Sequence, residues 1–152
     1  MNIEQLRITN LRKYLFDVVD EIVKNDNYQI NVDMLSKDIN NYSLDKIPAQ
    51  STVETWITGF EIHRDLFVFR SRMPYSQVVM ENLANVGFFE IFEGIIKNKN
   101  NNGELPEIDG IESIECLNSG TMVDNTTNTC MFQIQLQITY TYDGFKDDIV
   151  SL

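Results

Sequence analysis

The chain has few histidines, cysteines and basic residues, which are the side chains that most catalytic and nucleic-acid-binding proteins use. Its 152 residues include one histidine and two cysteines, and 12 basic side chains stand against 23 acidic ones. The single histidine, His63, would have to serve any Ser-His-Asp or acyl-transfer mechanism, and no Gly-x-Ser-x-Gly segment accompanies it. A net charge of −11 argues against clamping of a nucleic-acid backbone, because that requires clustered Lys and Arg to displace counterions.

Long apolar runs are missing as well. No uncharged apolar stretch approaches the roughly 20 residues that a membrane-spanning helix needs. The first residues include the acidic Glu4 and no apolar leader core, so we expect a soluble cytoplasmic protein. The length and the 43% hydrophobic content suit one domain, residues 1–152, with a core of its own.

The two cysteines, Cys116 and Cys130, both fall on the apolar side of predicted strands. Neighbouring strands could bring the two thiols together. Because the sequence carries no secretion signal, we expect two buried free thiols rather than a disulfide.

The strongest pattern in the chain is a period of two over residues 130–142. From Phe132 onward the even positions are apolar and the odd positions are Gln or Thr, which predicts one long β-strand with a core face and a polar face. The polar face has no charge, although a solvated strand face usually carries some. Two interpretations are open: this face contacts another protein surface, or it is a neutral solvated face. The residues concerned, called here the Gln/Thr row, are Gln133, Gln135, Gln137 and Thr139.

Helical spacing predicts two further regions. Apolar residues recur at intervals of three and four over residues 3–24, which predicts an amphipathic N-terminal helix. A second helical region starts near Ser76, a candidate N-cap, and runs to about Lys97. Gly87 interrupts it, so we expect a helical pair or one kinked helix.

The remaining segments are assigned to strands and connections. Residues 28–32 and 111–117 are predicted as strands, and residues 55–62 and 66–71 as a hairpin that turns at Arg64-Asp65. The predicted connections are an irregular segment at 33–50, a polar turn at 98–109, a long loop at 118–128 and a tail at 143–152. This order predicts an α+β fold, with an antiparallel sheet flanked by the N-terminal helix and the helical pair.

No constellation of residues predicts a catalytic, cofactor or metal site. Residues 98–109 match the oxygen spacing of a calcium loop, but the early ligands are neutral Asn, Pro106 interrupts the loop, and a strand follows where a helix should. Glu61, His63 and Asp65 alternate on one strand, where side chains two apart start about 7 Å from each other. We expect them to be exposed and solvated.

Five segments carry a resemblance to a known family. They are Ser-Arg-Met-Pro-Tyr-Ser at 71–76, Asn-Leu-Ala-Asn-Val-Gly-Phe-Phe at 82–89, Leu-Pro-Glu-Ile-Asp-Gly-Ile-Glu-Ser-Ile-Glu-Cys-Leu-Asn at 105–118, Gly-Thr at 120–121 and Phe-Gln-Ile-Gln-Leu-Gln-Ile at 132–138. Together they resemble the tail terminator proteins of long-tailed phages and prophages of Gram-positive bacteria, which also occur in phage-tail-like bacteriocins. The resemblance extends over about residues 56–142 and rests on whole segments, not on a catalytic signature.

The resemblance implies an α+β domain that forms a hexameric ring on the last ring of a tail tube. Such a ring stops tube growth and presents a surface to the head, its connector or a collar. The implied partners are copies of the chain itself, the tail tube protein, and in contractile particles the tail sheath. The implied location is the host bacterial cytoplasm during assembly, and then the virion or the phage-tail-like particle.

The residues that suit subunit contacts are the Gln/Thr row and three apolar residues of the acidic tail, Phe145, Ile149 and Leu152. Some members of this family carry an antibiotic-resistance label. The acetyl-transfer motif that would support the label, a His with an Asp four residues later, is missing here, because the residue four positions after His63 is Phe67. The alternatives are another neck or connector component of the same particle, and a small metabolic enzyme.

Overall fold

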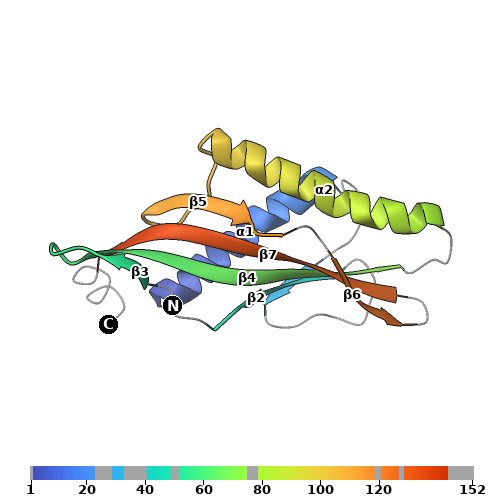
Figure 1. Ribbon diagram of the computed structural model, residues 1–152, viewed down its shortest axis with the longest axis horizontal. Coiled ribbons are helices and arrows are strands. Elements are labelled where there is room, and N and C mark those ends of the chain that lie inside the picture. The colour runs from blue at the N-terminus through green and yellow to red at the C-terminus, as the bar shows by residue number, and fades with distance from the viewer. Residues whose placement is uncertain are drawn as a thin grey trace.

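The structure is a computed structural model, and it describes residues 2–22, 29–32, 41–48, 52–74, 79–118, 121–126 and 129–143. Within these residues the chain has an α+β fold, as the sequence predicts (Figure 1). The elements in chain order are α1 (Ile3–Ile22), β1 (Gln29–Val32), β2 (Asn41–Lys46), β3 (Thr52–Thr55), β4 (Phe60–Pro74), α2 (Val79–Asn101), β5 (Ile111–Cys116), β6 (Thr121–Thr126) and β7 (Thr129–Asp143).

Two long antiparallel strands, β4 and β7, form the middle of the sheet. Each spans 15 residues, and they pair from Phe60 opposite Asp143 to Pro74 opposite Thr129. The strand order is β1-β2-β4-β7-β5, while β3 also pairs with β4 and β6 also pairs with β7. The sheet is antiparallel except at one edge, where β1 runs parallel to β2.

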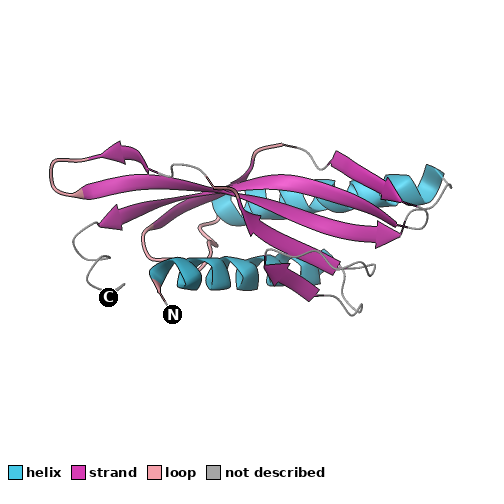
Figure 2. Cartoon of the chain, turned by 90° about the horizontal axis from the view of Figure 1, so that it is seen from below, coloured by secondary structure: helices cyan, strands magenta, loops and turns pink. Residues whose placement is uncertain are grey.

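The core lies between one face of this sheet and the two helices. Because side chains alternate along a strand, the even positions of β7 and the odd positions of β4 point to the same side. The ring of Phe69 stacks on Phe92 of α2 with 5.0 Å between centroids, and α1 runs beneath the same face (Figure 2). The core residues on these four elements are Leu11, Leu15, Val18, Val19, Phe67, Phe69, Phe89, Phe92, Ile96, Ile134, Leu136 and Ile138.

The predicted hairpin with its turn at Arg64-Asp65 is wrong. Both residues lie inside the uninterrupted strand β4, and the chain turns earlier, at residues 57–59, between β3 and β4. The pair resembles a turn because both residues are charged, yet Asp65 is buried in the sheet and accepts a hydrogen bond from Tyr140. Segment 33–50 was predicted to be irregular, but it contains β2, and the predicted loop at 118–128 contains β6.

Of the two arrangements predicted for this region, a helical pair or one kinked helix, the structure excludes the pair, because α2 is one helix. Gly87 lies inside it with nothing within 4 Å of an added Cβ, so the glycine costs helix propensity without ending the helix. The helix runs past Lys97 and ends at Asn101, and the turn Asn102-Gly103 follows it. There the amide of Glu104 donates to the carbonyl of Lys99 at 2.8 Å, which is the 6→1 bond of a Schellman cap.

Several predictions fall on residues that are not described. The possible N-cap Ser76 and the tail residues Phe145, Ile149 and Leu152 lie outside the described residues. The strands at 28–32, 111–117 and 130–142 and the N-terminal helix correspond to β1, β5, β7 and α1, within a few residues at each end.

Candidate functional site

The sheet face turned away from both helices carries the Gln/Thr row. In the register of β7 with β4, Gln133, Gln135, Gln137 and Thr139 stand opposite Arg70, Val68, Leu66 and Arg64. The glutamines are half-buried, and the short Thr139 side chain is buried between its cross-strand neighbours Arg64 and Ser113. The structure therefore places the four predicted residues in one row on the helix-free face. Their role in subunit contacts stays a prediction.

The charged side chains that flank the row on this face lie on the strands beside β7, namely β4 and β5, and on β2 beyond β4. Arg70 of β4 forms an ion pair with Asp45 of β2, Arg64 is exposed, and Glu115 of β5 stands opposite Gln137. The absence of charge thus belongs to the Gln/Thr row and not to the whole face. The face as a whole is a neutral central row with charged side chains on its flanking strands, which resembles the polar rim and uncharged centre of a protein interface.

An apolar hairpin tip is a second feature of the surface, and it is not among the sites predicted from the sequence. The tip consists of residues 56–60, which connect β3 to β4 at the left end of Figure 1. Ile57 is fully exposed, Trp56 is 47% exposed and Phe60 is 42% exposed. The signal in the sequence is a glycine among large apolar residues, Trp-Ile-Thr-Gly-Phe, which is unusual for a solvated turn.

Backbone hydrogen bonds hold this tip in one shape. The amide of Trp56 donates to the carbonyl of Phe60 at 2.7 Å, and the amide of Gly59 donates to the carbonyl of Trp56 at 3.0 Å. The indole Nε1 of Trp56 donates to Glu54 at 2.6 Å. The tip is therefore a preformed, mainly apolar protrusion whose exposed side chains carry two polar groups, the indole N–H of Trp56 and the hydroxyl of Thr58.

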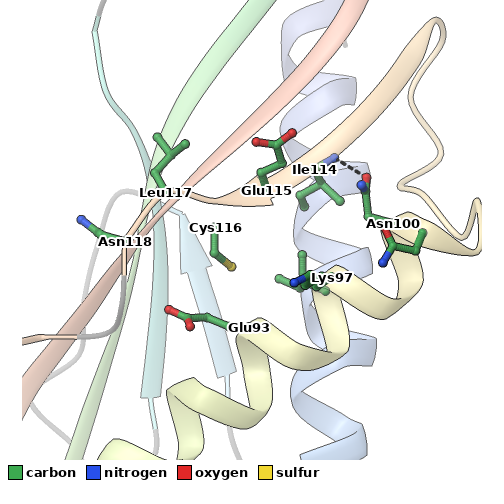
Figure 3. A pocket seen from close by; sticks show the side chains of 10 residues that line it. Glu93, Lys97, Asn100, Ile114, Glu115, Cys116, Leu117 and Asn118 are labelled. Atoms are coloured by element: carbon green, nitrogen blue, oxygen red, sulfur yellow. Dashed lines mark hydrogen bonds between the residues drawn. The ribbon is translucent and has the colours of Figure 1, made fainter.

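A cavity of about 500 Å³ opens between α2 and β5 (Figure 3). Its walls combine apolar and polar side chains, and the carboxylate of Glu93 and the thiol of Cys116 point into it from opposite sides. The amide oxygen of Asn100 accepts from the backbone amide of Ile114 at 3.0 Å, which joins the helix to the outer edge of β5. The residues that line it include Glu93, Ile96, Lys97, Ile114, Cys116 and Leu117.

Burial shifts the pKa of both titratable groups that point into this cavity, Glu93 and Cys116. Burial, together with a smaller contribution from the nearby Glu93, raises the pKa of Cys116 to about 12, so the thiol is protonated at neutral pH. Burial also raises the pKa of Glu93, with a contribution from Glu90, and Oε1 of Glu93 is buried without a hydrogen-bond partner among the described residues. A protonated thiol is a poor nucleophile, so the cavity suits binding rather than covalent catalysis.

A polar cluster lies on the helix side of the sheet, under the start of α1. The trio Glu61, His63 and Asp65 was expected to be exposed and solvated, and this is wrong, because their side chains are 23%, 12% and 3% exposed. The trio faces the helices because it shares the odd positions of β4 with the core residue Phe67. The ring of His63 packs 4.7 Å from that of Tyr142, centroid to centroid.

The carboxylate of Asp65 is the buried centre of this cluster. It accepts a 2.9 Å hydrogen bond from the hydroxyl of Tyr140, and Nζ of Lys46 lies 3.8 Å from it. Lys46 also pairs with Glu4 at 2.6 Å, and this hydrogen bond lowers the pKa of Glu4. The guanidinium of Arg7 lies 4.4 Å from the centroid of the Tyr140 ring. The cluster joins α1 to the sheet through charge and aromatic contacts.

Among the residues that the structure covers, no group of three His, Cys, Asp or Glu side chains is placed to hold a metal ion. Neither helix in that part of the chain combines the length and the apolar character that crossing a bilayer requires. Comparison of the sequence with profiles of known protein families and with curated proteins found no match.

Proposed function

We propose that the protein is a structural ring subunit that terminates the tail of a phage or phage-like particle. The observation that carries this proposal is the helix-free sheet face, along which the Gln/Thr row runs without a charge. The likeness of residues 56–142 to tail terminator proteins supplies the biological context. In this role six copies form a ring on the last ring of the tail tube, stop its growth and present a surface for the head, connector or collar.

The physical argument concerns what such a face is suited to. A strand face that stays in water usually carries charge, which keeps the protein soluble and discourages stray contacts. Amides and hydroxyls can hydrogen-bond across an interface without the cost of burying an ion. The row therefore suits a surface that a second copy covers.

The net charge fits passage of DNA through a ring. With 23 acidic and 12 basic residues, a subunit whose acids face the lumen repels phosphate and lets DNA move without sticking. A basic lumen in the assembled ring would contradict this part of the proposal.

The experiment measures assembly and tube capping together. Mass measurement in solution is expected to give a hexamer, and electron microscopy with tail tubes is expected to show rings at tube ends. Gln135→Lys with Gln137→Lys places two like charges in the row, which should abolish the ring and leave a folded monomer. The matched control is Lys13→Glu on the solvent side of α1, which should assemble normally.

The outcomes separate the alternatives. A chain that stays monomeric and never caps tubes overturns the proposal. Rings that bind a connector but do not bind tail tubes would assign the protein to the neck of the particle instead. Turnover of a small substrate that is lost in His63→Ala would favour an enzyme.

A further inference from the structure

We propose that the hairpin tip of one subunit inserts into the α2/β5 cavity of the next copy of the same chain. The two surfaces are different parts of the molecule, so each subunit offers one tip and one cavity. This inference rests on the proposed function, since it names the contact that closes the ring.

The tip has the properties of an interface anchor. Three large apolar side chains, Trp56, Ile57 and Phe60, stand on one turn, and Ile57 is fully exposed. The backbone bonds between Trp56 and Phe60 and between Gly59 and Trp56 fix the turn before binding, so little conformational entropy remains to be lost. Tryptophan is enriched among residues that dominate binding energy, because it buries a large apolar area and carries one donor.

The cavity has the complementary properties. Its volume of about 500 Å³ falls in the range of roughly 300–1,000 Å³ that is typical of binding pockets. Leu117, which is 43% exposed in the free subunit, gives it an accessible apolar wall, and the lining also includes the core residues Ile96 and Ile114, each only 1% exposed. The buried Oε1 of Glu93 is an acceptor without a partner among the described residues, and such an atom is costly to leave unsatisfied. An occupant that fits must bring apolar bulk and one hydrogen-bond donor.

Trp56 supplies both requirements. Its indole N–H now donates to the exposed Glu54, so insertion exchanges a solvated acceptor for the buried oxygen of Glu93. The ring of Trp56 and the neighbouring Ile57 would cover the apolar walls of the cavity.

The tip cannot reach the cavity of its own subunit. Phe60 at the base of the tip pairs with Asp143, whereas Cys116 on the cavity wall pairs with Leu136. These partners lie seven residues apart on β7, which is about 23 Å at roughly 3.3 Å per residue. The hairpin also points away from the cavity, beyond the end of the sheet (Figure 1). A contact between unlike surfaces of identical copies repeats from one copy to the next, and it closes into a ring when the rotation allows.

The chain has one tryptophan, so its fluorescence reports directly on the tip. In a dilution series, assembly should shift the Trp56 emission to shorter wavelength and reduce its quenching by acrylamide. Trp56→Ala should weaken association by about thirtyfold or more, as for other buried tryptophan anchors. Trp56→Phe keeps an aromatic ring without the donor, so it should weaken association less. The control Leu6→Ala removes an exposed apolar side chain elsewhere and should leave assembly unchanged.

A mixing experiment tests the pairing of unlike surfaces. Trp56→Ala retains an intact cavity, and Leu117→Asp retains an intact tip. Neither variant should form rings alone. Their equimolar mixture should stop at a heterodimer, because only one intact tip and one intact cavity can meet.

The results distinguish this inference from the proposed function. Two results would overturn the insertion and leave the ring proposal standing. In the first, rings form while acrylamide still quenches the Trp56 fluorescence as strongly as in the free subunit. In the second, Trp56→Ala forms rings as well as the wild type does. Trp56→Ala rings that no longer cap tubes overturn it too, by assigning the tip to the tube. A blue shift caused by lipid vesicles but not by concentration also overturns it. A wild-type chain that neither assembles nor caps tubes overturns the proposed function itself.

Discussion

The hydroxyl of Tyr140 lies 2.9 Å from Oδ2 of Asp65, a carboxylate whose side chain is only 3% exposed. This bond joins β7 to β4 in the middle of the sheet. Lys46 and Arg7 add positive charge around it, 3.8 Å from the carboxylate and 4.4 Å from the ring centroid. Burial, followed by the charge of Asp65, raises the pKa of Tyr140, so the phenol stays protonated and remains a donor. A buried carboxylate is tolerated here because the donor and the cations accompany it.

Loss of this bond should destabilise the fold measurably. Tyr140→Phe removes the donor and leaves the buried carboxylate with Nζ of Lys46 at 3.8 Å, so we expect a loss of about 1–3 kcal/mol in the free energy of unfolding. Urea denaturation measures it. A double-mutant cycle with Asp65→Asn isolates the pair, and single effects that simply add would contradict the coupling.

The same contact explains how much of the sheet the sequence could predict. Strand β7 was found because its alternation is uninterrupted from Phe132 onward. Strand β4 was divided at Arg64-Asp65, since a charged pair inside a strand is normally a turn signal. What permits Asp65 there is its partner Tyr140, which is 75 residues away in sequence and is chosen only by the register of the two strands.

The candidate surfaces show a similar limit. The position of the Gln/Thr row on one face follows from alternation alone, so the sequence predicted it. The charged flanks from Arg64, Arg70 and Glu115 required the register with β4 and β5, which the sequence does not reveal. The α2/β5 cavity could not be predicted, because it depends on how α2 packs against the edge of β5. The hairpin tip could not be predicted either, because the turn was predicted at Arg64-Asp65 and not at residues 57–59.

The core between α2 and the sheet should be the most sensitive region to truncation. Phe92 is fully buried and stacks on Phe69, so Phe92→Ala should reduce the free energy of unfolding by about 3–5 kcal/mol. Its neighbour Ile91 is 54% exposed, and Ile91→Ala should change stability by no more than about 0.5 kcal/mol. Chemical denaturation of dilute protein measures both. Equal losses would mean that α2 does not pack with the orientation described.

Two glycines with similar backbone angles should respond differently to alanine. Gly103 has φ of 74° with nothing within 4 Å of an added Cβ, so Gly103→Ala should cost only the left-handed strain of about 1–2 kcal/mol. Gly110 has φ of 75°, but its Cβ would lie 2.5 Å from the carbonyl oxygen of Thr141. Gly110→Ala should therefore cost clearly more, because the turn must move away from β7. Thermal unfolding compares the two, and equal costs would contradict this close approach.

The thiol of Cys116 should be slow to react and should become reactive only at high pH. Its pKa is raised from 9.0 to about 12 by burial and then by Glu93, so at pH 8 only about one molecule in ten thousand carries the thiolate. Because the folded-state pKa is the raised one, the stability linked to this group is fully present below pH 9 and is lost as the pH rises toward 12.

Alkylation with iodoacetamide, followed by peptide mapping to separate Cys116 from Cys130, gives the rate at each pH. Glu93→Gln removes the smaller of the two causes and should accelerate alkylation modestly, with burial still dominant. Rapid labelling of Cys116 at pH 8 in the folded wild type would show that the cavity wall is not desolvated as described.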